Sequence, residues 1–247
     1  KKSYINTLKY FGFNENDISA NNTLAIQYIK DINKINKEIN IIPIKRKDSK
    51  HEDKDIINSI YQSSTNIRKL RLNNNFEYKN YVNENVYKEL KKEVFTIDSY
   101  FDIFKYLLTI EKVNISENPH YENGMENLLM NSFKNAKNLK EAIDLTVNKR
   151  YSESRIKRLL ICMLLDIKKD DIENIDKISY IKPLAFNEKG REILSSIDEN
   201  IQIINKPNKA HLDKINQRFL DIDIKATFLY NMFSNNLNND YINNPFI

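Results

Sequence analysis

The sequence has few of the residues on which many common folds and sites depend. It contains three glycines, five prolines and no tryptophan among 247 residues. Glycine-rich phosphate loops, collagen-like repeats and turn-dense β-sandwiches need many glycines or prolines, so the composition argues against all three. No apolar run approaches the roughly 18 residues of a membrane-spanning helix, and no signal-peptide block follows the first residues. We therefore predict no membrane partner.

Cysteine and histidine are also scarce. The single cysteine, Cys162, excludes an internal disulfide bond and a zinc site built from several cysteines. The three histidines, His51, His120 and His211, lie far apart and lack the spacing of metal ligands. We predict no metal site from these residues, and a reduced, cytoplasmic setting.

The sequence is rich in charged and aromatic residues. Hydrophobic residues make up 40% of the chain, charged residues 30% and aromatic residues 11%. This composition supports a packed core, and the length allows one large domain or two small ones. The net charge is +5 and the isoelectric point is near 8.9. Such a mildly basic chain is compatible with an RNA partner but does not require one.

Residues 1–75 have the pattern of an incomplete α/β domain. Apolar side chains recur at helical spacing over residues 21–36, where Asn21 and Asn22 are predicted caps. Residues 39–44 are β-branched and interrupted by Pro43, which predicts a buried strand that ends near Arg46. Because parallel strands need neighbours, this strand would lack partners without further strands of a sheet.

Residues 76–247 have a mainly helical pattern. Three amphipathic stripes begin near residues 97, 125 and 139, and a further helix is predicted after Ser152. Residues 178–186 and 201–204 are predicted short strands that flank a helix at 188–196. A last helix is predicted within residues 209–233. We therefore predict an α/β remnant followed by a mainly helical region with about two short strands.

Two clusters could bind a nucleotide. Asn21 at a helix start and Arg46 at a strand end would lie on the edge of an α/β sheet where nucleotides bind. In residues 63–68, hydroxyl groups precede a helix that carries Arg68 one turn in. Such a helix start can hold phosphate without glycine, although an ordinary serine cap has the same pattern.

A third cluster is basic and could bind RNA. Lys149 and Arg150 precede a predicted helix, and Arg155 and Arg158 project from nearly the same side of it. Tyr151 is available in the same segment for stacking on a base. A run of charges is also typical of a solvated helix face, so the pattern alone does not decide.

Several segments, in consistent order from residue 20 onward, resemble the motifs of one family. Residues 20–28 resemble P-N-N-x-L-G-I-x-Y, and residues 63–68 resemble S-A-T-x-I-R. Residues 123–127 resemble E-G-L-E-N, and residues 149–158 resemble K-R-Y-x-x-x-R-I-x-R. Residues 184–192 resemble a late segment of the same family. The family is that of the bacterial tRNA(Met) cytidine acetate ligases.

This resemblance implies a nucleotidyltransferase domain of Rossmann-like, HUP type followed by a helical, tRNA-binding region. It implies that ATP, with magnesium, activates acetate as acetyl-adenylate, and that the acetyl group passes to the wobble cytidine of elongator tRNA(Met). The resemblance assigns ATP binding to Asn21, Arg46, Ser64 and Arg68. It assigns tRNA or active-site contacts to Lys149, Arg150, Tyr151, Arg155 and Arg158.

The sequence departs from the family pattern at several positions. The family's H-x-G-H motif, whose imidazoles stabilise charge on the phosphates, is absent. Asn123 replaces a Glu, Leu128 replaces an Arg and Ala25 replaces a Gly. We therefore interpret the chain as the C-terminal part of such an enzyme and expect it to be inactive alone. Its catalytic residues are not identified.

Three other functions stay open from sequence alone. A noncatalytic RNA-binding helical module would use the same basic cluster, and ATP dependence would separate the two. A nucleotidyltransferase acting on another acid would share residues 63–68, since a fold does not specify the acid. A purely structural helical protein would bind neither ATP nor RNA.

Overall fold

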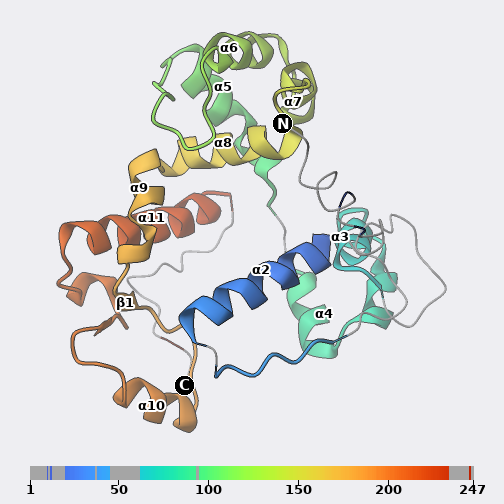
Figure 1. The fold of residues 1–247 in the computed structure, drawn as a ribbon. Helices are drawn as coiled ribbons and strands as arrows, with labels where there is room; N and C mark the ends of the chain where they lie inside the picture. The colour runs from blue at the N-terminus through green and yellow to red at the C-terminus, as the bar shows by residue number, and fades with distance from the viewer. Residues whose placement is uncertain are drawn as a thin grey trace. The chain divides into compact units, whose positions relative to one another are not determined.

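The computed structural model describes residues 10, 12, 20–36, 38–44, 62–92, 95–233 and 245. It divides into two compact units, Lys1–Lys92 and Glu93–Ile247, which are treated separately below (Figure 1). The boundary predicted at residue 75 therefore lies inside the first unit. The reason is that a 3-10 helix, η2 (Phe76–Tyr81), packs back onto the helix that precedes it. The functional assignment of the two regions stays a prediction.

The first unit begins with α2 (Ala20–Ile35), and this confirms the predicted helix. Asn21 and Asn22 lie in its first turn, so their predicted role as caps is wrong. Residues 38–44 are described without a strand, and Ile42 and Ile44 are 82% and 90% exposed. The predicted buried strand is wrong for this structure, because no strand among the unit's described residues offers the hydrogen bonds that a sheet needs.

The rest of the first unit is a small helical assembly of α3 (Ser64–Leu72), η2 and α4 (Glu84–Leu90). The predicted serine cap is confirmed, because the Ser63 hydroxyl accepts a hydrogen bond of 3.1 Å from the backbone N–H of Asn66. Arg71 of α3 donates hydrogen bonds to the carbonyl oxygens of Leu90 and Lys92. These bonds fasten the end of α4 to α3.

The second unit contains the main hydrophobic core. Its helices are η3 (Ile97–Tyr100), α5 (Phe101–Thr109), α6 (Met125–Asn135), α7 (Leu139–Thr146) and α8 (Glu153–Leu165). Figure 1 shows α5, α6 and α7 grouped on one side of α8. The core residues Phe104, Phe133 and Leu159 are fully buried, and each comes from a predicted amphipathic face. The prediction of a helical core is confirmed.

Beyond α8 the chain forms a smaller layer on α11 (Lys214–Asn231). Its elements are α9 (Lys169–Glu173), η4 (Ile175–Lys177), β1 (Tyr180–Ile181), α10 (Glu188–Ser195), β2 (Gln202–Ile203) and η5 (Pro207–Lys209). The two strands are parallel, with Tyr180 opposite Gln202, and α10 lies between them in sequence. Ile204, Leu220 and Ile224 form the buried cluster of this layer. The predicted strand–helix–strand order is confirmed.

Arg218 of α11 fastens this layer to the end of α8. Its guanidinium group donates to both carboxylate oxygens of Asp171, at 3.1 and 3.0 Å, and to the carboxylate and carbonyl oxygens of Asp166. Burial is the largest single influence on Asp171 and opposes its ionisation. The hydrogen bonds from Arg218 and the Lys168 backbone, together with the charges of Arg218 and Lys168, outweigh it and lower the pKa of this carboxyl group. Helices long and apolar enough to cross a membrane are absent from the described part of the chain.

Candidate functional site

The basic cluster lies where the loop after α7 enters α8. The Asn148 side chain accepts hydrogen bonds from the backbone N–H groups of Arg150 and Tyr151, at 2.8 and 3.1 Å. The Ser152 hydroxyl caps α8 by accepting from the backbone N–H of Arg155 at 3.4 Å, which confirms the predicted cap. These local bonds fix the backbone that carries the cations.

Two of the cations are held by one carboxylate. Arg150 and Arg155 donate to different oxygens of Glu122, and the Arg155 bond is 3.0 Å long. Arg155 also donates to the carbonyl oxygen of His120 at 3.0 Å. The hydrogen bond from Arg150 is the largest cause that holds the pKa of Glu122 below its usual value. Glu122 is therefore ionised near neutral pH and cancels one of the two positive charges.

Tyr151 is in contact with both of these guanidinium groups. Its ring centroid is 5.3 Å from the Arg150 guanidinium carbon and 5.4 Å from that of Arg155. The side chain is only 4% exposed and belongs to the core of the second unit. In this conformation the ring therefore offers almost no surface to an RNA base, and a tRNA contact of Tyr151 stays a prediction. The ring instead supports two cations through cation–π contact.

The other two cations of the cluster are accessible. Lys149 and Arg158 are exposed, and neither side chain forms a hydrogen bond or an ion pair with any residue that the structure describes. Burial, together with the charges of Arg158 and Arg155, lowers the pKa of His120. His120 is therefore mostly neutral near pH 7, and the positive charge available to a ligand resides on Lys149 and Arg158. Such a pair can bind an anion such as phosphate.

The nucleotide clusters predicted from sequence lie in the first unit. Ser64 is the exposed first residue of α3, and Arg68 is exposed and donates to the Thr65 hydroxyl at 3.3 Å. Asn21 is exposed on α2. Arg46 lies outside the described residues. The structure therefore places the Ser64 hydroxyl and the Arg68 guanidinium group at the start of α3. It does not test whether Asn21 and Arg46 lie near these two groups.

The sequence matches the HIGH nucleotidyl transferase family over residues 2–244. The chain therefore belongs to that family. A relative from Clostridium perfringens is 35% identical over 93% of this chain, and one from Clostridium kluyveri is 33% identical over 92%. Both are named tRNA(Met) cytidine acetate ligase. The chain spans 58% of the length of each, and the resemblance to these ligases found in the sequence is confirmed.

Solved structures show the same fold. Thermotoga maritima TmcAL in its apo form superposes with a TM-score of 0.79 at 23% identity, over 98% of this chain and 64% of that one. A second structure of that protein, bound with alpha-thio ATP, gives a TM-score of 0.73 over 94% of this chain and 60% of that one. The predicted fold class of this family member is confirmed.

Sequence reasoning missed the acidic partner of the basic cluster. Glu122 lies 28 residues before Arg150, in the loop before α6. That distance gives no local signal, because only the packing of the α6 and α8 starts brings the two side chains together. The only indication in the sequence is that Glu122 directly precedes Asn123, the first residue of the segment that resembles E-G-L-E-N.

Nothing among the described residues suggests a metal centre in this family member. Groups of three or more His, Cys, Asp or Glu side chains that could hold a metal ion are not found in this part of the chain. Cys162 is half-buried, and burial raises the pKa of its thiol. It therefore packs as part of α8 and is a poor nucleophile near neutral pH.

Proposed function

We propose that the protein to which this chain belongs is an ATP-dependent tRNA(Met) cytidine acetate ligase. The observation that carries this proposal is the match to curated ligases over 93% of the chain, combined with a basic cluster at the start of α8. In this proposal, the second unit binds tRNA and the first unit contributes to the ATP site. Because tRNA is the substrate, the protein would act in the cytoplasm.

The proposed reaction has two steps. An acetate oxygen attacks the α-phosphorus of ATP, and the bond to pyrophosphate breaks to give acetyl-adenylate. The exocyclic amine of the wobble cytosine then attacks the acetyl carbon, loses a proton, and displaces AMP. Both steps depend on positioning and on stabilising negative charge. We assign no catalytic residue, because the sequence lacks the H-x-G-H motif, and we expect no acetylation by this chain alone.

The ATP contacts are proposed from the first unit. The exposed hydroxyl of Ser64 and the guanidinium group of Arg68 lie on the start of α3, where backbone N–H groups favour phosphate. Asn21 and Arg46 would complete the set. The solved structure of Thermotoga TmcAL with alpha-thio ATP supports ATP as the nucleotide. No described residue is assigned to magnesium.

The tRNA contacts are proposed from the second unit. Lys149 and Arg158 are free to neutralise backbone phosphates, whereas Arg150 and Arg155 are oriented by Glu122. Since an RNA phosphate competes with the carboxylate for the same donors, the free cations should make the larger contribution to affinity. Tyr151 would act by holding the two arginines in place.

The test is a salt series of tRNA binding by the full chain. Replacing Lys149→Gln and Arg158→Gln together should lower the slope of log affinity against log salt by about 2, because each lost phosphate contact removes about 1. Lys134→Gln with Lys140→Gln is the matched control, since both lysines are exposed in the same unit outside the cluster. Equal slopes for the two double variants would contradict the proposed tRNA surface.

A noncatalytic RNA-binding module is the second candidate, because the basic cluster at the start of α8 would serve it equally well. The two candidates differ in ATP binding. If the chain contributes to an ATP site, Asn21→Ala and Arg68→Ala should each weaken ATP binding, measured by calorimetry. Unchanged ATP affinity in both variants would favour the noncatalytic module.

A further inference from the structure

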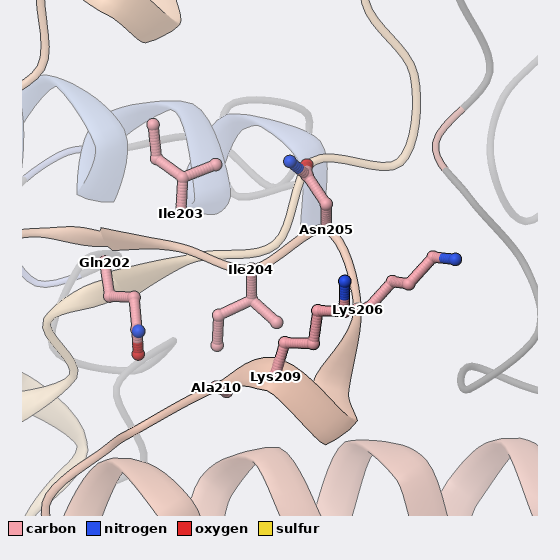
Figure 2. Close-up of a pocket in the computed structure, with 7 residues that line it drawn as sticks. All are labelled: Gln202, Ile203, Ile204, Asn205, Lys206, Lys209 and Ala210. Atoms are coloured by element: carbon pink, nitrogen blue, oxygen red, sulfur yellow. The ribbon is translucent and has the colours of Figure 1, made fainter.

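A hollow of about 360 Å³ lies in the second unit, between the end of β2 and η5 (Figure 2). Its volume is at the lower end of the roughly 300–1,000 Å³ typical of ligand sites. None of its residues belongs to the basic cluster at α8. The lining residues are Gln202, Ile203, Ile204, Asn205, Lys206, Lys209 and Ala210.

The two charged side chains that line this hollow are both positive. Residues 200–212 contain no Asp or Glu, while Lys206 and Lys209 both line the hollow. Neither lysine side chain forms an ion pair or a hydrogen bond with the residues described for this chain. Two ammonium groups without carboxylate partners make this edge attractive to an anion.

The backbone holds the two lysines on one tight turn. The N–H of Lys209 donates to the carbonyl oxygen of Lys206 at 3.1 Å, and Pro207 fixes the start of η5. Figure 2 shows Lys209 reaching from η5 toward the end of β2, while Lys206 extends outward from the turn. Lys209 therefore places its ammonium group beside the hollow, and Lys206 adds positive charge at its outer rim.

The interior of the hollow differs from its edge. Ile204 is buried, and with Ala210 it provides an apolar floor. The side chain of Gln202 lies on the same face of β2, and its buried oxygen receives no hydrogen bond from a described residue. The terminal torsion of a glutamine is soft, so this carboxamide can turn toward a donor in the hollow. Buried polar atoms without partners are rare in folded proteins.

We propose that this hollow binds one unpaired nucleotide of the RNA substrate, as a second contact separate from the α8 cluster. The base lies on the apolar floor and its edge donates to Gln202, while Lys206 and Lys209 neutralise the adjoining phosphates. Single-stranded RNA presents these groups together, because its bases are splayed from the backbone. The inference rests on the proposed function, since it requires that the chain bind tRNA.

The experiment measures binding of an elongator tRNA(Met) transcript to the full chain across a salt series. The variant Lys206→Gln with Lys209→Gln should lower the salt slope by about 2. Gln202→Leu should lower affinity about 3- to 10-fold at every salt concentration, because it removes a hydrogen bond without changing charge. Lys134→Gln with Lys140→Gln is again the control, and circular dichroism checks that each variant is folded.

The outcomes separate this inference from the proposed function. If the hollow variants bind like the wild type while Lys149→Gln with Arg158→Gln loses slope, the second contact is wrong and the α8 surface stands. If both pairs lose slope and Gln202→Leu loses affinity with an unchanged slope, the hollow is an RNA site. If the wild-type chain shows no salt-dependent tRNA binding, both proposals are wrong.

Discussion

The two units of the molecule use amphipathic helices in opposite ways. In the second unit, the apolar faces of α5, α6 and α8 are buried against one another, and Leu159 has no exposed surface. In the first unit, α2 has an equally regular apolar face, yet Leu24 is 50% exposed and Tyr28 is 60% exposed. Periodicity therefore predicts a helix in both units, but it predicts burial only where another described element supplies the opposite face.

The most direct test of this difference between the units truncates one leucine in each of them. Leu159→Ala should lower the free energy of unfolding by about 2–5 kcal/mol, because it leaves a cavity in the core of the second unit. Leu24→Ala should change it by no more than about 0.5 kcal/mol, because the side chain is half-exposed. Urea denaturation followed by circular dichroism measures both. Equal losses would mean that α2 is packed as tightly as α8.

A second prediction concerns the contact that fastens α11 to the end of α8. Arg218→Ala leaves the carboxylate of Asp171, whose side chain is 11% exposed, without its bidentate partner. The expected loss of unfolding free energy is about 1–3 kcal/mol, which allows for the partial exposure of Arg218. Arg191→Ala on the exposed face of α10 is the control and should change stability by less than about 0.5 kcal/mol. If both variants lose the same free energy of unfolding, the contact between Arg218 and Asp171 contributes nothing to stability.

The helix caps provide a comparison of the two units that does not depend on burial in a core. Ser63 in the first unit and Ser152 in the second each accept a backbone hydrogen bond at a helix start. Replacing either by Ala should cost about 1 kcal/mol, because capping is local and does not depend on the wider core. Thermal unfolding monitored by circular dichroism measures the two losses. A loss confined to Ser152→Ala would mean that α3 is not independently ordered.

The smallest expected effect is a pH dependence of the second unit. The pKa of His120 is below its ordinary value of 6.5, so the unfolded chain takes up a proton before the folded chain does. Stability is therefore complete above about pH 6.5 and falls as the pH drops toward the lower folded pKa. The lowered pKa of Glu122 affects stability only below about pH 4.5, which lies outside the pH range of this measurement. Urea midpoints between pH 7.5 and 5 should decline in the wild type and decline less in His120→Gln.

The sequence predicted most of the second unit and the helices α2 and α3 of the first, but the strand that it predicted in the first unit is wrong. The helices at 125–135 and 153–165 follow from their spacing, and Ser152 marks a helix start that the structure confirms. The strand expected at 39–44 is not formed, because a strand depends on hydrogen-bond partners that its own residues do not specify. The hydrophobic pattern of residues 39–44 therefore could not show whether those partners are present.

The candidate site was predicted only in part for the same reason. The run at 149–158 identified the cations, but not the carboxylate that holds two of them, because Glu122 comes from a distant loop. The sequence pattern predicts an accessible Tyr151 ring next to the basic side chains, whereas the ring is buried and in contact with them. Charge and spacing indicate which residues share a surface. Which of them are free to bind depends on tertiary contacts.

The central claim is that the basic start of α8 recognises the tRNA substrate of a cytidine acetate ligase. The most direct measurement compares binding of this chain to elongator tRNA(Met) and to an unrelated tRNA across a salt series. We predict tighter binding to tRNA(Met), with affinity that falls steeply as salt increases. Equal affinity for the two tRNAs, or no salt dependence, would contradict the claim.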